Sequence, residues 1–258
     1  MLSSAHIAAS AAAGHVLAAA GTAPSPLWYT ARATGVVALI LLTLTVALGV
    51  AGSTRLSTPA LPRLVRSGLH RNISLLSVAF VATHVLTTVL DPYASISITS
   101  AIVPFSSRYR PFWLSLGTIA FDMLLALVLT SMVRTRLSYR IWRAVHWLAY
   151  ASWPIALWHG LGTGSDSKLS WLLALDALCV LVVAAAALWR LQLLPPGRTR
   201  AIGRAVTAAV AAATVVFVAV GPLQSGWARR AGTPSSMLGS AHTTATHTRG
   251  TTTSGGSA

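Results

Sequence analysis

The sequence predicts an all-α membrane protein, built as a bundle of six transmembrane helices. Its 258 residues are 54% hydrophobic and only 9% charged, whereas an ordinary soluble domain has about 25% charged residues. The apolar residues form blocks of about 20, the length that a helix needs to cross a hydrocarbon core of about 30 Å. Six blocks are present, at roughly 29–51, 70–90, 112–133, 143–160, 170–190 and 202–222.

Arginines between the apolar blocks predict the orientation of the bundle. The formal charge of +15 could suggest a nucleic-acid partner, but the arginines cluster in the first, third and fifth connections. The positive-inside rule explains this pattern better, so we expect those connections in the cytoplasm and both termini outside, in the cytoplasmic membrane of a bacterium. The clusters consist of Arg55, Arg63 and Arg66, of Arg134, Arg136 and Arg140, and of Arg198, Arg200 and Arg204.

The two ends of the chain differ from the apolar blocks. Residues 1–28 are rich in alanine without a preceding Lys or Arg, which favours an outward-facing or interfacial segment over a cleaved signal or a seventh span. Residues 192–222 are expected to form a basic loop and the sixth helix. Residues 223–258 are rich in Gly, Ser and Thr and are predicted to be a disordered tail.

Several cofactor classes are excluded by what the chain lacks. Cys179 is the only cysteine and lies in the fifth block, which excludes an intrachain disulfide, a thiolate cluster and covalent haem attachment, and favours a packing role. No glycine-rich turn between a strand and a helix is present, and no soluble block is long enough for a nucleotide-binding domain. We therefore expect no flavin or nicotinamide site on this chain.

Four histidines lie within or beside the apolar blocks at matched depths. His70 and His84 are fourteen residues apart, which separates them by about 21 Å along a helix and places them within about 40° of one face. His146 and His159 lie at the two ends of the fourth block. Because the second and fourth helices run in the same direction, His70 should be level with His146, the inner pair, and His84 with His159, the outer pair.

Facing imidazoles at two depths are what axial ligation of two b-type haems requires of a helix bundle. Neutral imidazole binds iron strongly and brings no net charge into lipid. Three alternatives remain open: histidines hydrogen-bonded between helices, a proton relay or quinol site, and a transporter or structural protein whose histidines bind a metal ion or protons.

The fourth block poses a geometric difficulty for the haem interpretation. Thirteen residues separate His146 from His159, a rotation of about 220° on an ideal helix, which would place the rings on nearly opposite faces. Pro154 lies between them. A proline usually kinks a helix, and tightening toward a 3₁₀ turn near it would bring the two rings closer to one face.

Four stretches resemble the ferric reductase-like transmembrane family, over about residues 29–191. They read LHRNISLLSVAFVATHVLTTVLDP, PFSSRYRPFWLSLG, TSMVRTRLSYRIWRAVHWLAYASWP and LWHGLGTGSD. The resemblance implies a five-helix haem-binding domain in which His70/His146 and His84/His159 are the axial ligands of two haems b. It implies electron transfer across the membrane, as the membrane haem component of a ferric reductase-like oxidoreductase.

The chain departs from the family's oxidases and eukaryotic reductases because it lacks their fused flavin and nicotinamide domain. A subunit supplied with electrons by quinol or by a separate flavoprotein is therefore more plausible than a self-sufficient enzyme. The acceptor on the outer face could be ferric iron, a flavoprotein or a reductase partner, and no residue selects among them.

Charged residues near the histidines are candidates for supporting roles. Arg71 and Arg143 lie at the inner level and could each bind a haem propionate through paired hydrogen bonds, although both could be positive-inside residues only. Arg108 and Arg110 could do the same at the outer level. Asp122 and Asp176 lie within predicted spans, where an acid suggests proton uptake or, more simply, a neutral hydrogen-bonded carboxyl. Gly160 to Asp166 could approach the outer haem or form a helix end.

Overall fold

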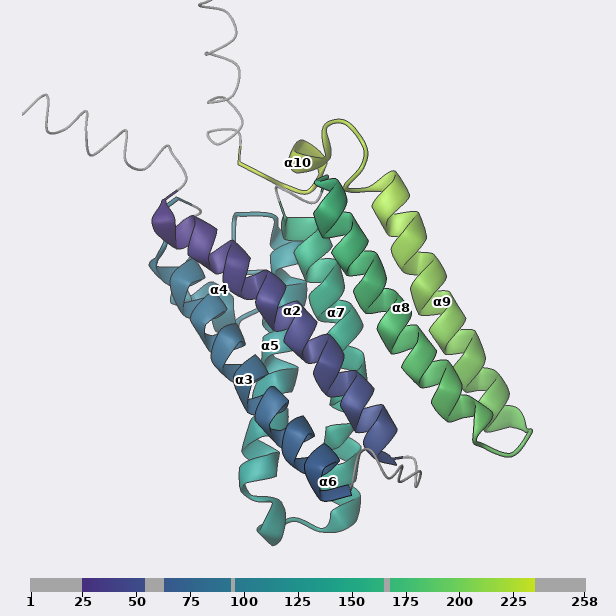
Figure 1. Ribbon diagram of the computed structural model, residues 1–258. Helices are drawn as coiled ribbons and strands as arrows, with labels where there is room; N and C mark the ends of the chain where they lie inside the picture. Colours follow the sequence, from purple (N-terminus) through teal and green to yellow (C-terminus); the bar gives the residue numbers. More distant parts are fainter. Residues whose placement is uncertain (1–24, 54–62, 94–95, 165–167, 235–258) are drawn as a thin grey trace, which may run out of the picture.

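The computed structural model describes residues 25–53, 63–93, 96–164 and 168–234, and these residues form helices and loops without a strand (Figure 1). Five of the helices are long and apolar enough to cross a membrane, which indicates a multi-pass membrane protein. They are α2 (Pro26–Ser53), α3 (Arg63–Leu90), α5 (Pro111–Met132), α8 (Ser170–Gln192) and α9 (Arg198–Val220).

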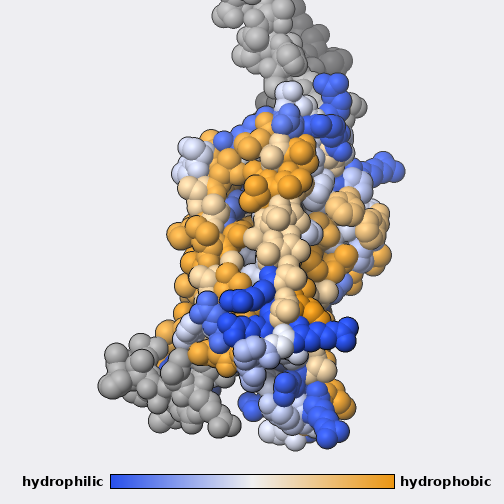
Figure 2. Space-filling view, turned by 90° about the vertical axis from the view of Figure 1, so that its right-hand side faces the viewer, coloured by the Kyte–Doolittle hydropathy of each residue, from blue (hydrophilic) through white to orange (hydrophobic). Residues whose placement is uncertain are grey.

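Shorter helices lie at the ends of the bundle or complete it. Helices α4 (Ile98–Ile102) and α10 (Trp227–Arg230) lie at the end where α2 begins, and α6 (Tyr139–His146) lies at the opposite end beside the 3₁₀ helix η1 (Arg134–Arg136) (Figure 1). Helix α7 (Leu148–Thr163) runs through the bundle. A hydrophobic band covers the side of the molecule, with hydrophilic residues above and below it (Figure 2).

The fourth apolar block is divided into α6 and α7 at Trp147. The Trp147 N–H lies 3.2 Å from the carbonyl oxygens of both Arg143 and Ala144, and the Tyr150 N–H donates to the Trp147 carbonyl at 3.1 Å. These bonds tighten the chain toward a 3₁₀ turn. The tightening therefore lies directly after His146, whereas α7 continues through Pro154, the position at which the sequence suggested it. With 16 residues, α7 is shorter than the five long helices.

Helices α2 and α7 occupy the centre of the bundle. Helix α2 packs against α3, α7 and α8, while α5 packs against α7 and α8 against α9. Leu157 and Leu161 of α7 are almost fully buried and lie in one apolar cluster with Val46 and Val50 of α2. Cys179 is buried in the same cluster, in keeping with a packing role.

Residues 223–234 correct the prediction of a disordered tail for that part of it. They form a turn and α10, and the Trp227 ring lies 5.4 Å from the ring of Trp113 and 5.7 Å from that of Phe217. One aromatic side chain thus anchors a segment whose composition is otherwise polar. Residues 235–258 of the predicted tail, and residues 1–24 of the N-terminal segment, lie outside the described residues.

Candidate functional site

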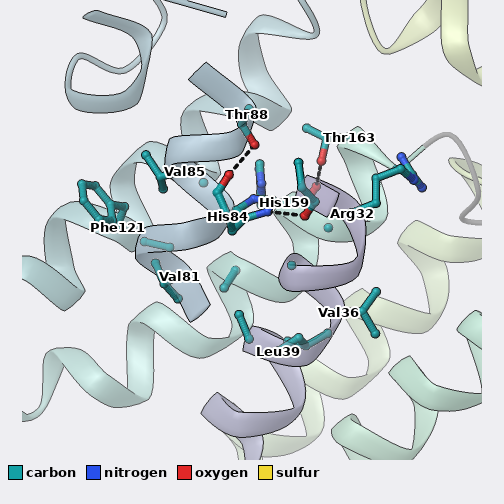
Figure 3. A pocket seen from close by; sticks show the side chains of 18 of the residues that line it. Arg32, Val36, Leu39, Val81, His84, Val85, Thr88, Phe121, His159 and Thr163 are labelled. Carbon is teal, nitrogen blue, oxygen red and sulfur yellow. Dashed lines mark hydrogen bonds between the residues drawn. The ribbon is translucent and has the colours of Figure 1, made fainter. Parts of the chain in front are cut away.

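The outer pair of histidines meets between α3 and α7, as the sequence predicted. The ring centroids of His84 and His159 lie 6.2 Å apart, with an angle of 77° between the ring planes. Both rings face the interior of the bundle, with α2 passing beside them (Figure 3). The structure therefore brings together two side chains that are 75 residues apart in the sequence.

Backbone carbonyls fix the orientation of both outer rings. His84 Nδ1 donates to the Ala31 carbonyl at 2.7 Å, and His159 Nδ1 donates to the Trp113 carbonyl at 2.9 Å. A carbonyl can only accept, so the proton of each neutral imidazole is on Nδ1 and the lone pair is on Nε2. Metal-binding histidines in proteins are usually held in this way.

A cavity of about 590 Å³ adjoins the outer pair, within the range of about 300 to 1,000 Å³ for cofactor pockets. Its walls are apolar, with Leu39, Val81, Val85 and Phe121 among the side chains around the rings (Figure 3). Polar side chains are few and include Arg32, Asp91 and Asp176. The cavity therefore suits a large, mostly apolar ligand with a polar edge.

The outer pair fits iron held in a macrocycle better than a metal ion held by protein alone. A metal bound by Nε2 of two rings lies about 2.0 to 2.1 Å from each, and each ring centroid lies about 1.1 Å further, so the centroids would be about 6.3 Å apart. The observed distance is 6.2 Å. No group of three or more His, Cys, Asp or Glu that could hold an ion occurs among the described residues, whereas haem iron needs only two protein ligands.

The inner pair is held more loosely. The His146 ring stacks on Trp142 with 4.8 Å between centroids, and the Arg134 guanidinium lies 4.6 Å from the centroid of the Trp142 ring. His70 lies in the first turns of α3, at the end of the bundle that also carries α6 and His146 (Figure 1). Within the described part of the chain, the buried Nδ1 atoms of both rings lack a hydrogen-bond partner; the Thr45 backbone approaches His70 but falls short of hydrogen-bond geometry.

The predicted arginines take different positions. Arg71 and Arg143 are exposed at the inner end, and Arg108 is exposed at the outer end. Arg110 is buried, with 3% of its surface exposed, and lies away from the cavity lining. The sequence thus predicted correctly at which end of the bundle each arginine lies. The contacts of Arg110, however, indicate a role different from the predicted one.

Arg110 fastens the outer end of the bundle instead of facing a ligand. Its Nη1 donates to the Gly162 carbonyl at 2.8 Å and its Nε donates to the Thr233 hydroxyl at 2.9 Å, while its backbone N–H donates to the Gly232 carbonyl at 3.0 Å. Burial lowers the pKa of the guanidinium from its ordinary value. The interpretation of Arg110 as a propionate ligand is corrected, because its bonds join α5, α7 and the segment after α10.

The two predicted acids differ in position, and so do the residues of the glycine-rich stretch. Asp176 of α8 lines the outer cavity, whereas Asp122 of α5 is half-buried outside that lining. Gly160 and Gly164 line the cavity, and Gly162 packs against the Trp113 ring. Residues 165–167 lie outside the described part of the chain.

Sequence reasoning missed Arg32 and three glycines at the site. Arg32 lines the outer cavity, and its guanidinium is directed away from the two rings (Figure 3); a basic residue inside the first apolar block was the signal that could have identified it. Gly35, Gly49 and Gly117 each lie against a histidine ring. The fourteen-residue spacing of Gly35 and Gly49, equal to that of His70 and His84, was the corresponding signal.

Comparison with known families agrees with this geometry. Residues 34–157 match the family model described as "Ferric reductase like transmembrane component". This segment is a ferric reductase-like transmembrane domain. The match is narrower than the resemblance over 29–191, and it contains His70, His84 and His146 but ends two residues before His159. A ferric reductase-like domain indicates a role in transmembrane electron transfer.

Two further comparisons gave no match. No curated protein and no solved structure is significantly similar to this chain. The assignment of the ferric reductase-like domain therefore rests on the family model together with the histidine geometry.

Proposed function

We propose that the protein is a di-haem b electron-transfer protein that passes electrons across the membrane to an acceptor on the outer face. The outer pair carries the proposal: its two rings lie 6.2 Å apart beside a large apolar cavity, and a carbonyl fixes the proton of each on Nδ1. The ferric reductase-like domain supports the same function.

The ligands of the two haems would be His84/His159 at the outer level and His70/His146 at the inner level. When bound, the haems would supply one-electron redox chemistry. Nε2 of each ring would hold the iron, and the apolar walls would exclude water. In this proposal α6 and α7 together form the fourth of six spans, and about 21 Å along α3 separates the two levels.

Three arginines are the proposed partners of the anionic haem edges. Arg32 lines the outer cavity, and Arg71 and Arg143 lie at the level of the inner pair. A guanidinium can donate two parallel hydrogen bonds to one carboxylate, so these residues would fix the rotation of each haem about its iron–ligand axis. Arg32 replaces Arg110 in this role.

The orientation follows from the arginine-rich end of the bundle. The arginine-rich elements η1, α6 and the beginning of α9 carry six of the clustered arginines and lie at the end opposite to the start of α2 (Figure 1). By the positive-inside rule this end faces the cytoplasm and both termini face outward. The proposed location is the cytoplasmic membrane of a bacterium.

The donor and acceptor of the proposed system are separate molecules. Quinol or a flavoprotein on the cytoplasmic side would supply electrons, and ferric iron, a flavoprotein or a reductase partner would accept them outside. The chain would then be the membrane haem component of a ferric reductase-like oxidoreductase.

One observation favours a second candidate, a proton-conducting or transporting membrane protein. Asp176 shares the lining of the outer cavity with His84 and His159, and titratable groups in one intramembrane cavity can relay protons. In the haem proposal Asp176 instead supports proton uptake linked to electron transfer or keeps a neutral carboxyl in the wall.

The visible spectrum of the purified protein separates these candidates. After expression with ample haem, we expect two haem equivalents per chain and a Soret band that shifts on reduction with dithionite. His84→Ala should remove one equivalent. A wild-type protein without a Soret band would reject the haem proposal, and retention of two equivalents by His84→Ala would reject His84 as a ligand.

A further inference from the structure

Three of the four histidine rings lie against a glycine on a neighbouring helix. A Cβ atom added to Gly117 of α5 would lie 2.5 Å from His159 Nδ1, and one added to Gly35 of α2 would lie 3.0 Å from His84 Nδ1. At Gly49 of α2 the added atom would lie 3.3 Å from His70 Cε1. At Gly117 only the absence of a side chain allows so close an approach, whereas at Gly35 and Gly49 an added Cβ atom would require the ring to move by a few tenths of an ångström.

Each of these glycines follows the histidine's backbone partner by four residues. Ala31, which accepts the bond from His84, precedes Gly35 by four, and Trp113, which accepts the bond from His159, precedes Gly117 by four. The third case repeats the spacing at Gly49, since Thr45 is the residue whose backbone approaches His70.

Helix geometry explains the repeated spacing. In an α-helix the carbonyl of residue i−4 points at the N–H of residue i, so a Cβ atom at position i stands beside that carbonyl. A glycine there exposes the carbonyl from the side, and a ring can then donate Nδ1–H to it while the helix keeps its own bond. Glycine is otherwise a poor choice within a helix.

The positions on α2 follow the register of two antiparallel helices. Gly35 faces His84 and Gly49 faces His70, so a step of fourteen residues forward on α2 corresponds to fourteen residues back on α3. The same spacing of glycine and histidine therefore occurs at both levels of one helix pair, and only at the outer level does the ring donate its Nδ1–H to the exposed carbonyl.

We propose that Gly35 and Gly117 are positioning residues that set the orientation and the donor strength of His84 and His159, and that Gly49 makes room for the ring of His70. The inference rests on the proposed function in one respect, namely that the group bound at Nε2 is haem iron. A hydrogen bond from Nδ1–H raises the basicity of the ligand, and a more basic ligand favours ferric over ferrous iron.

The principal test is Gly117→Ala in the full-length, haem-loaded protein. The added methyl group would separate the His159 ring from the Trp113 carbonyl. We expect loss of up to one haem equivalent and, in the haem that remains at this site, an upward shift of the reduction potential and a changed ferric low-spin EPR signal. Gly35→Ala should give a smaller upward shift, and Gly49→Ala the smallest.

Two variants serve as matched controls. An added Cβ at Gly203 would lie 2.5 Å from Leu191 Cδ2, as close as at Gly117 but against no histidine, and one added at Gly68 would meet nothing within 4 Å. Gly203→Ala and Gly68→Ala should keep two haem equivalents, the wild-type potentials and the wild-type EPR signal.

The outcomes separate this inference from the proposed function. A wild-type protein without haem rejects the proposed function itself. A haem-loaded wild type whose Gly117→Ala variant keeps both potentials and EPR signals overturns the positioning inference alone, and so does an equal change in Gly203→Ala. If Gly117→Ala does not accumulate, the order of Gly35→Ala and Gly49→Ala decides, and an unshifted potential in both overturns the inference.

Discussion

The outer and inner histidine pairs have similar spacings in the sequence, yet the structure holds them differently. Both outer rings donate to a carbonyl of a neighbouring helix, whereas the buried Nδ1 atoms of the inner rings have no such bond among the described residues. The comparison teaches that the spacing of the histidines sets the depth of each pair, and that the neighbouring helices set how rigidly its rings are held.

His146 differs most from the other three histidines. His70, His84 and His159 are each followed four residues later by a hydroxyl side chain that donates to the carbonyl of that histidine, at 2.7, 2.7 and 2.6 Å. His146 ends α6 and is followed by the tightened turn at Trp147. Its ring is held by stacking on Trp142 instead.

The largest effect is expected from His159→Ala, which should abolish the outer site and leave the inner site intact. His159→Ala should reduce the haem content from two equivalents to one and slow electron transfer to the outer acceptor by more than about 100-fold, beyond the 10–100-fold typical of a lost hydrogen-bond partner of a ligand. Haem content and the rate of reoxidation by an outer acceptor measure this. His146→Ala is the control, which should remove the inner haem instead; identical spectra for the two variants would contradict two distinct sites.

Arg110→Gln tests the fastening of the outer end. The variant loses bonds to Gly162 and Thr233 and leaves a buried carbonyl without its partner, at about 1 to 3 kcal/mol for such a group. We expect a lower unfolding temperature with an unchanged ratio of haem to folded protein. Arg108→Gln, at an exposed position, is the matched control; equal stability of the two variants would argue against the fastening role.

Trp142→Ala tests the stacking that holds the inner pair. Loss of an aromatic stack costs about 0.5 to 1.5 kcal/mol beyond the buried area, so the affinity for the inner haem should fall by roughly 2- to 12-fold, since about 1.4 kcal/mol is tenfold. Haem titration of the apoprotein would measure it. The outer site should keep its spectrum, and an equal loss at both levels would mean that Trp142 supports the whole bundle.

The smallest effect is expected at the exposed inner arginines. Arg71→Gln and Arg143→Gln remove charges that lie in contact with solvent, where ion pairs contribute about 0 to 1 kcal/mol. The potential of the inner haem should fall slightly, because a lost positive charge disfavours the added electron, and should depend less on salt concentration than that of the wild type. Loss of the inner haem in either variant would show that these residues are required for its binding.

Much of the fold could be predicted because it follows from local composition. Apolar length predicted α2, α3, α5, α8 and α9 within a few residues except at the start of α3. The aromatic packing of Trp227 could not be predicted from the composition of the tail, because its partners Trp113 and Phe217 lie on α5 and α9. The sequence placed the tightened turn near Pro154 instead of at Trp147, because proline is a signal that can be recognised locally and the turn at Trp147 has no such signal.

By itself the sequence determined the membrane environment, the arginine-rich end and the depths of the four histidines, because helix rise and hydropathy are properties of a single segment. The tertiary structure decided which carbonyl meets each ring, that Arg110 joins three segments, and that Arg32 lines the cavity. These features depend on contacts between helices. Gly35, Gly49 and Gly117 depend on both the sequence and the tertiary structure. Their spacing can be read from the sequence, but their role is visible only once a histidine ring packs against each of them.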